Sequence, residues 1–341
     1  MAQRFFTALC LGLTLIFSAH AQEVLRVLAW PGYAEPEQVK AFEALYQVRV
    51  QLSLVSSDEA LRQQVQAHQG GDFDVVAANT VEIKKFIAQK LLRPLTLSQI
   101  PRVASQLPRF SEVKGIPGIT LGEAVFAVPY TYAEMGLIYD RKQFTQPPTS
   151  ISVMWDPRYQ GKVLAFNDAN HNFSIASLSL GDKPFQIDNA RFDLVVERLI
   201  ALRRNALAFY TLPEESVELF LRHKAAVLFA NYGRQQLKLL QDAGADVGYV
   251  IPEEGALAWL DCWAITRGAN NPLLAHQWIN FMLDHEASEA LVQGQGLSNT
   301  VSAPVEGGAT QALHWLETVE DEARRSGYWA RIASGDRPEQ F

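Results

Sequence analysis

The chain has 341 residues, of which 48% are hydrophobic and 20% charged, with a formal net charge of −7 at pH 7. This length exceeds the roughly 100–200 residues of one domain, so two domains are expected. The acidic balance argues against a nucleic-acid partner and mildly favours a cationic solute.

The first 21 residues have the features of a secretory signal peptide. Arg4 gives a positive start, Phe5 to Phe17 is an almost unbroken apolar stretch, and Ala19-His20-Ala21 offers small residues to a signal peptidase. The apolar stretch is shorter than the ~20 residues needed to span a bilayer. We therefore predict cleavage before Gln22 and a periplasmic protein, in preference to a membrane anchor.

Short β-like runs alternate with helical patterns along most of the chain, which is typical of an α/β fold. In the first part, strands are expected at 24–29, 48–54 and 73–78, and helices begin at Pro36 and after the caps Ser57 and Thr80. Further strands are expected at 124–128 and 135–139 (with Pro129 between them), 162–166, 225–229, 247–251 and 259–265. Further helices are expected at about 172–180, 188–203, 213–223 and 232–243, and from Pro272.

Two domains without a flexible linker predict two lobes joined by strand crossovers. The signal peptide is assigned to residues 1–21 and the first lobe to 22–128 plus 258–302. The second lobe is assigned to 129–257 plus 303–341, which includes a polar C-terminal tail.

Motifs of catalysis and metal binding are missing from the sequence. It contains no G-x-S-x-G, no H-E-x-x-H, no Walker loop and no G-x-G-x-x-G after a strand, and its seven histidines show no paired metal spacing. Export would leave Cys262 as the only cysteine, in an apolar run where a buried side chain is expected. We predict no catalytic residue, no metal and no cofactor, and hence a protein that is not an enzyme.

Candidate recognition residues follow the ends of the predicted strands, because ligands of α/β proteins bind there. Trp30 and Tyr33 flank a Pro-Gly turn after the first strand, and Asn79 and Thr80 follow the third. The alternatives are that Trp30 only covers the core of its lobe, and that Asn79 and Thr80 only cap a helix.

Two carboxylates occupy similar places later in the chain. Asp168 ends a strand shortly before His171, and alternation along a strand puts Trp259, Asp261 and Trp263 on one face. A carboxylate flanked by rings suits an ammonium ligand, which gains charge pairing and cation–π attraction. The alternatives are that Asp168 is a helix cap and that Asp261 is bonded to a backbone turn.

The sequence resembles the polyamine-binding (spermidine/putrescine) branch of the periplasmic solute-binding proteins that serve ABC importers. The resemblance covers about Leu25 to Thr300. It is carried by Ala29-Trp30-Pro31-Gly32-Tyr33, Asp72-Phe73-Asp74-Val75-Val76, Ala127-Val128-Pro129-Tyr130, Trp155 to Lys162, Asn167-Asp168-Ala169, Glu254-Gly255 and Trp259-Leu260-Asp261. It implies a type II periplasmic-binding-protein fold, in which two α/β lobes joined by crossover strands hold a ligand cleft between them.

By position, the resemblance implies that Trp30, Tyr33 and Trp259 sandwich the methylene chain of a polyamine, while Asp261 and Asp168 receive its ammonium groups. The sequence departs from the family where His171 replaces a second carboxylate. It also departs at Asn79, Val81 and Ala230, which replace serine, tyrosine and tryptophan, although Tyr232 could partly substitute for the last ring. The ligand is therefore expected to be a small cationic amine, with a shorter amine or a monocation left open.

The resemblance further implies a monomer that closes about a hinge when solute binds and then docks on a membrane partner. That partner is the permease of an ABC importer or, alternatively, a membrane sensor to which the protein reports ligand occupancy.

Overall fold

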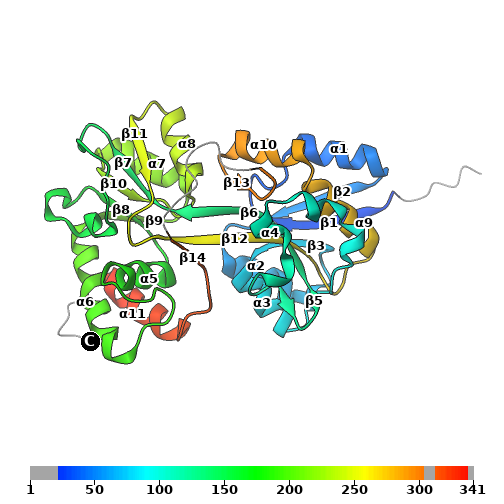
Figure 1. Cartoon of the computed structure of the whole chain (residues 1–341), viewed down its shortest axis with the longest axis horizontal. Helices are drawn as coiled ribbons and strands as arrows, with labels where there is room; N and C mark the ends of the chain where they lie inside the picture. Colours follow the sequence, from blue (N-terminus) through cyan, green and yellow to red (C-terminus); the bar gives the residue numbers. More distant parts are fainter. Residues whose placement is uncertain (1–21, 303–311, 337–341) are drawn as a thin grey trace, which may run out of the picture.

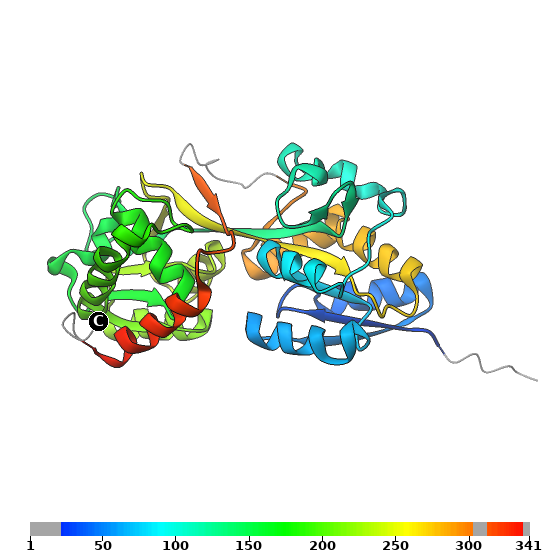
Figure 2. The same cartoon turned by 90° about the horizontal axis from the view of Figure 1, so that it is seen from below.

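The computed structural model describes residues 22–302 and 312–336. Its two α/β lobes are joined by the long antiparallel strands β6 (Ala127–Met135) and β12 (Ala256–Ile265), which run side by side from one lobe into the other (Figures 1 and 2). The predicted signal peptide lies outside the described residues. Among the residues described, no helix has the length and apolarity needed to cross a membrane.

A seven-stranded sheet forms the centre of the first lobe, in the order β13-β6-β12-β3-β1-β2 with β14 paired to β12. Its other strands are β1 (Val24–Ala29), β2 (Arg49–Leu54), β3 (Val75–Asn79), β13 (Ser298–Asn299) and β14 (Leu313–Trp315). Strands β2, β1 and β3 are parallel, whereas β12 is antiparallel to both β3 and β6. The carboxyl end of β3, at Asn79, consequently pairs with the middle of β12, and β1 lies on the other side of β3.

Helices cover both faces of this sheet. On one face, α1 (Pro36–Tyr46) and α9 (Pro272–Met282) bury Phe42 and Trp278 in a common core, and each begins with a proline, whose fixed φ suits the first turn. On the other face, α2 (Asp58–Gln66) and α3 (Thr80–Ala88) bury Leu61 and Phe86. The lobe also contains α4 (Pro108–Ser111), α10 (His285–Gln295) and the small β4 (Thr120–Leu121) and β5 (Ala124–Val125) pair.

The second lobe is built on a five-stranded sheet in the order β11-β7-β10-β8-β9. Its strands are β7 (Leu137–Asp140), β8 (Val163–Phe166), β9 (Ala206–Tyr210), β10 (Val227–Phe229) and β11 (Val247–Val250). Its helices are α5 (Ala169–Ser179), α6 (Asn189–Asn205), α7 (Pro213–His223), α8 (Arg234–Asp242) and the C-terminal α11 (Glu322–Ser334). Apolar side chains are buried on both faces of the sheet.

The alternation of strands and helices predicted from the sequence is confirmed, with two local corrections. Asn79, not Thr80, is the N-cap of α3, because the Asn79 Oδ1 accepts from the N–H groups of Val81 and Glu82. Pro129 does not separate two strands but lies within β6, where the register slips opposite the step from Asp261 to Cys262. Such a bulge tolerates a residue that has no N–H to donate to the ladder.

Beyond residue 311, the chain adds β14 to the first sheet and then packs on the second lobe. Strand β14 pairs in parallel with residues 256–258 of β12, and α11 then packs on α5 and α6 (Figure 2). The lobe boundaries at residues 128 and 257 stay a prediction.

Candidate functional site

Asp261 lies at the middle of β12, beside the carboxyl end of β3. It pairs with Asn79 of β3 and Thr131 of β6, and only 6% of its surface is exposed. The Tyr33 hydroxyl donates a 2.7 Å hydrogen bond to the Asp261 Oδ2. This donor is a side chain of the turn after β1 and not a backbone N–H of a turn. Whether Asp261 serves the structure or a ligand stays a prediction.

Tyr33 is held in place by the bulge in β6. The extra residue of that bulge is Tyr130, whose hydroxyl donates to the Tyr33 carbonyl at 2.8 Å and whose ring meets the Tyr33 ring edge-on. Tyr33 and Tyr130 are both buried, which raises the pKa of each phenol. Both phenols therefore stay protonated at neutral pH, and Tyr33 acts as a fixed hydrogen-bond donor.

Asn79 serves two structural purposes. Its Oδ1 caps α3, as the helix-cap interpretation predicts, and its Nδ2 lies 3.2 Å from both carboxylate oxygens of Asp58. Asp58 is the first residue of α2, after Ser57, whose hydroxyl accepts from the Ala60 N–H. The side-chain amide thus ties the start of α2 to the start of α3 beside Asp261.

Trp259 sits where the two lobes meet. Its ring packs against the apolar cores of both lobes, and its Nε1 donates a 3.0 Å hydrogen bond to the Asn231 carbonyl in the second lobe. Two polar atoms, the Trp30 Nε1 and the Asn231 Oδ1, are buried without a hydrogen-bond partner among the described residues. Trp30 packs against the cores on both faces of the first sheet, as the core-covering alternative predicts, while part of it stays exposed.

The predicted residues of the second lobe gather at the end of β8. Asp168 is the N-cap of α5, where its Oδ1 accepts from the His171 N–H at 2.8 Å, so the capping interpretation is confirmed. The Asp168 side chain is nevertheless 38% exposed, and the His171 Nδ1 lies 3.2 Å from it in poor hydrogen-bond geometry. The His171 and Tyr232 rings both contact Phe166, and the Tyr232 hydroxyl donates to the Thr211 carbonyl.

Electrostatics connects these groups across the lobes. Burial, together with the negative charges of Glu82 and Asp168, raises the pKa of Asp58 to about 7. Burial raises the pKa of Asp261 to about 7, and the charge of Asp58 adds to this rise. The hydrogen bond from Tyr33 acts in the opposite direction. Burial raises the pKa of Tyr232 to about 12, and the charge of Asp58 contributes to that shift. Asp58 therefore acts on groups of both lobes.

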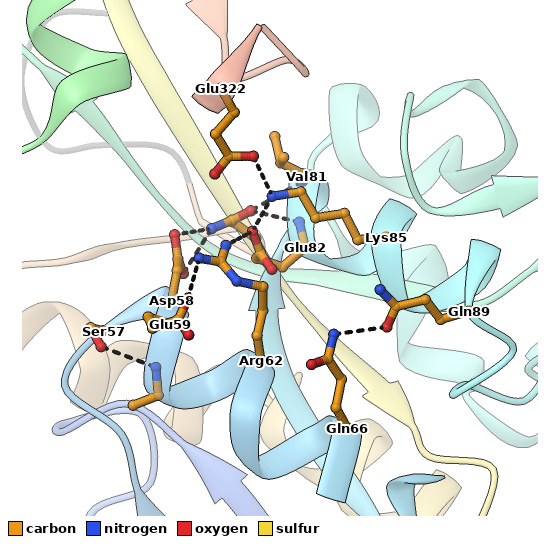
Figure 3. A network of polar contacts seen from close by, with 12 residues as sticks. Ser57, Asp58, Glu59, Arg62, Gln66, Val81, Glu82, Lys85, Gln89 and Glu322 are labelled. Carbon is orange, nitrogen blue, oxygen red and sulfur yellow. Dashed lines mark hydrogen bonds and ion pairs between the residues drawn. The ribbon is translucent and has the colours of Figure 1, made fainter. Parts of the chain in front are cut away.

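A network of ion pairs surrounds Asp58 (Figure 3). Arg62, one turn further along α2, pairs with Glu59 and with the buried Glu82, which also accepts from Lys85. Lys85 in turn reaches Glu322 at the start of α11 in the second lobe, at 3.1 Å. The cluster thus contains one contact between the lobes, from Lys85 to Glu322. It also contains one carboxylate, Asp58, that forms no ion pair with Arg62 or Lys85.

A cavity of about 520 Å³ is lined by Leu260, the neighbour of Asp261 on β12, and by residues of both lobes. The other lining residues are Thr80 and those at 109–110 and 115–117, at 183–186, and at 313–317, a stretch that includes β14. It contains none of the eight predicted ligand residues, so the candidate site is placed by its side-chain chemistry and not by this cavity. No cluster of three or more metal-ligating side chains occurs in residues 22–302 and 312–336.

The structure brings Tyr33, Asn79 and Asp261 together in one group, with Trp259 bridging to the second lobe, and places Asp168, His171 and Tyr232 together in another. Asp58 and Tyr130 are additions that the sequence did not suggest. Asp58 looks like an ordinary first-turn acid of a capped helix, and nothing in the sequence shows that β3 lies beside it.

A comparison with known families decides the class of protein. The family model described as bacterial extracellular solute-binding protein matches residues 37–312. The chain belongs to this family.

Individual relatives of this solute-binding protein agree with the resemblance. The spermidine/putrescine-binding periplasmic protein 1 of Haemophilus influenzae is 24% identical over 281 residues, 82% of this chain and 76% of the relative. The norspermidine sensor of Vibrio cholerae is 23% identical over 288 residues, 83% of this chain and 76% of the sensor. Among solved structures, the TpPotD lipoprotein of Treponema pallidum is similar with a TM-score of 0.76 at 18% identity, over 91% of this chain and 99% of the lipoprotein.

The predicted fold class, two α/β lobes of the periplasmic-binding-protein type, is therefore confirmed, and so is the resemblance to the spermidine/putrescine-binding proteins. The residues that hold the solute stay a prediction.

Proposed function

We propose that this solute-binding protein captures a small cationic amine, a polyamine such as putrescine or spermidine, between its lobes and delivers it to an ABC importer. It acts in the periplasm, after export directed by the signal peptide predicted at residues 1–21. The names of the curated relatives support both the ligand class and the compartment.

The environment of Asp261 carries this proposal. The carboxylate is 6% exposed, and the groups that shift its pKa are the Tyr33 hydroxyl and the Asp58 carboxylate, with no cationic side chain among them. A buried carboxylate without a counter-charge is costly. An ammonium group of the ligand supplies that counter-charge, while the partly exposed rings of Trp30 and Trp259 attract the cation and cover its methylene groups.

The predicted ligand residues come from both lobes, which favours closure of the lobes around the ligand. Tyr33 and Asp261 belong to the first lobe, Asp168 and Tyr232 to the second, and Trp259 contacts both. A ligand that touches both lobes binds the closed arrangement more tightly than the open one, and so shifts the population toward closure. The closed form is then the one that a permease recognises.

Isothermal titration of the purified full chain with putrescine and spermidine tests the proposal. Asp261→Asn should weaken binding by about tenfold or more, as expected for a lost hydrogen bond to a charged group. The exposed carboxylate of Asp242, paired with Lys238 on the surface of the second lobe, provides the control variant Asp242→Asn. Absence of binding to either amine at millimolar concentration, or equal affinity of Asp261→Asn and the unaltered protein, contradicts the proposal.

A second candidate function is supported by the similarity to the norspermidine sensor of Vibrio cholerae. In that case the closed protein reports amine occupancy to a membrane receptor instead of a permease. Deletion of the gene separates the two functions. Loss of amine uptake supports the importer, whereas unchanged uptake with loss of an amine-dependent response supports the sensor.

A further inference from the structure

The cavity of about 520 Å³ is lined from both lobes and lies outside the candidate amine site, since neither Asp261 nor Asp168 lines it. The first lobe contributes residues of α4 and the segment 115–117, and the second contributes the segment 183–186, between α5 and α6. Its volume falls within the range of roughly 300–1,000 Å³ that is typical of small-molecule sites. The protein therefore has a second space in which a small molecule can contact both lobes.

The walls of this cavity are mainly apolar and include three aromatic rings. Phe110 of α4 and Phe185 of the second lobe are both buried. Trp315 of β14 meets the Phe110 ring edge-on, with the two ring centroids 6.3 Å apart, and Leu260 of β12 adds a further apolar surface. Such walls favour a ligand with an aromatic body, because its binding removes apolar surface from water and allows contacts between rings.

Contacts that need no ligand hold two of these walls in place. In the second lobe, the Lys183 carbonyl accepts a 2.8 Å hydrogen bond from the Ser177 hydroxyl. In the first lobe, Gly118 has a φ of +89°, and a Cβ there would lie 2.6 Å from the carbonyl oxygen of Thr80, which itself lines the cavity. The loop after residue 117 is thus packed directly on the first residue of α3. A cavity formed in advance loses less freedom when a ligand binds.

Two basic side chains, one from each lobe, belong to the cavity lining. Arg109 of the first lobe and Lys183 of the second are both exposed to solvent. Neither takes part in an ion pair among the described residues. The lining therefore has two formal positive charges and, with Glu317, one negative charge, on a chain whose net charge is −7. This local excess of positive charge favours an anionic ligand.

The Arg109 guanidinium lies over aromatic rings instead of beside a carboxylate. Its Cζ is 4.7 Å from the centroid of the Phe110 ring and 4.6 Å from that of the Tyr132 ring. Attraction between a cation and a ring face holds the guanidinium there. A guanidinium that lies over a ring keeps N–H groups free at its edge, and these match the two oxygens of a carboxylate.

We propose that this cavity is a binding site for a small aromatic carboxylate. Its ring lies among Phe110, Phe185 and Trp315, and its carboxylate binds Arg109, while Lys183 supplies a second positive charge from the other lobe. Because the ligand contacts both lobes, its binding favours the arrangement in which the two walls lie this close. The site takes an anion and does not depend on the amine proposed above.

Naphthalene-1-acetate and naphthalene-1-acetamide are a matched pair of probes for this site. They share the same ring and nearly the same shape, and only the acid carries a charge. The unaltered protein should bind the acid about fivefold more tightly at low salt, as expected for two exposed charge contacts, and the preference should shrink as salt is added. Isothermal titration of the full chain, with no amine present, measures both affinities.

Variants of the two basic side chains locate the site. Arg109→Gln and Lys183→Gln should each reduce the preference for the acid to about twofold or less, with little change in affinity for the amide. Arg49→Gln in the first lobe and Lys142→Gln in the second are the matched controls. They remove the same charge from exposed side chains that do not line the cavity, and should retain the preference.

Four results would overturn the inference. The unaltered protein binds neither probe at millimolar concentration, it binds both equally, either cavity variant keeps the full preference, or the control variants lose it as the cavity variants do. The comparison of the two probes on the unaltered protein needs no variant. Each of these results leaves the capture of an amine untouched, and a failure to bind amines leaves this site untouched, so the two proposals fail separately.

Discussion

The Tyr33 hydroxyl and the Asp261 carboxylate form a buried pair in which the tyrosine is the donor, at 2.7 Å. The two residues are 228 positions apart in the sequence, and β12 brings them together. In the proposed function, the phenol donates to one carboxylate oxygen and the ligand binds at the other. That proposal makes Tyr33 a residue that positions the carboxylate as well as a contact of the ligand.

We expect Tyr33→Phe to weaken amine binding by about five- to tenfold, since a net hydrogen bond contributes about 1 kcal/mol. The ring and its edge-on contact with Tyr130 remain, so folding should be retained. Tyr46→Phe makes the same change on α1 and should leave affinity unaltered. Titration with spermidine measures the effect, and equal affinities of the two variants would contradict the positioning role.

The second prediction concerns pH and the free energy of unfolding without ligand. Burial raises the pKa values of Asp58 and Asp261 to about 7 in the folded protein, from the ordinary value of 3.8. The folded state therefore binds more protons than the unfolded state between about pH 4 and pH 7, and stability falls as pH rises through that window. The charged neighbours Glu82, Arg62 and Asp168 contribute to the shift of Asp58 and are present in every comparison below.

Chemical denaturation at pH 5, 6, 7 and 8 tests this expectation. The ligand-free protein should lose stability as pH increases, and a variant with both Asp58→Asn and Asp261→Asn should lose less, because amides do not titrate. The difference between the two curves isolates these carboxyl groups from the others that titrate. Parallel curves would mean that the two groups have ordinary pKa values in the folded protein.

Much of the fold could be predicted from local sequence patterns, because the residues that determine such a strand or helix lie within that same segment. The strand at 24–29 and the helix at 213–223 have the predicted bounds, and proline at the first helical turn marked the starts of α1 and α9. Strand β14 was not predicted, since its three residues are a strand only through pairing with β12. Local propensity carries no signal for such a strand.

The candidate site was predicted less completely for a related reason. Trp259 and Asp261 could be identified because strand alternation places an acid beside rings. Asp58 depends instead on the packing of α2 against the end of β3, and Tyr130 on a bulge opposite Asp261. Contacts of this kind join distant segments and have no pattern within either segment.

The third prediction concerns the ion pair that connects the lobes. Lys85 Nζ lies 3.1 Å from Glu322 Oε2, with side-chain exposures of 27% and 46% (Figure 3). Pairs this exposed contribute about 0.2–1 kcal/mol and are screened by salt. Glu322→Gln should therefore produce a small shift toward a more open arrangement, seen as a larger radius of gyration in small-angle scattering at low salt, which disappears at high salt.

Lys114 and Glu123 form an exposed pair of similar length, 2.8 Å, within the first lobe. Glu123→Gln is thus a matched control that removes an ion pair without touching the lobe junction. An equal change in both variants, or no salt dependence in Glu322→Gln, would show that the Lys85–Glu322 pair does not bias the lobes.

The fourth prediction concerns Arg325, which attaches the C-terminal helix to the second lobe. Its side chain is fully buried and makes two hydrogen bonds to Glu320, at 2.9 and 2.6 Å. It also donates to the Ser174 hydroxyl and to the carbonyls of Asn170 and Pro184. Since Asn170 and Ser174 belong to α5, whose N-cap is Asp168, Arg325 supports the helix that presents a predicted ligand group.

Arg325→Met should lower the free energy of unfolding by about 3–5 kcal/mol, because it leaves the Glu320 carboxylate and the buried carbonyls without their donor. Arg324→Met is the control, one residue earlier on α11, where the guanidinium stacks on Phe192 and bonds to an exposed Asn189. Its cost should stay near 1 kcal/mol or below, as expected for a partly exposed contact. Chemical denaturation distinguishes the two variants. If both lose the same stability, Arg325 acts only through the apolar part of its side chain, and the support of α5 must come from the ring contacts of α11 instead.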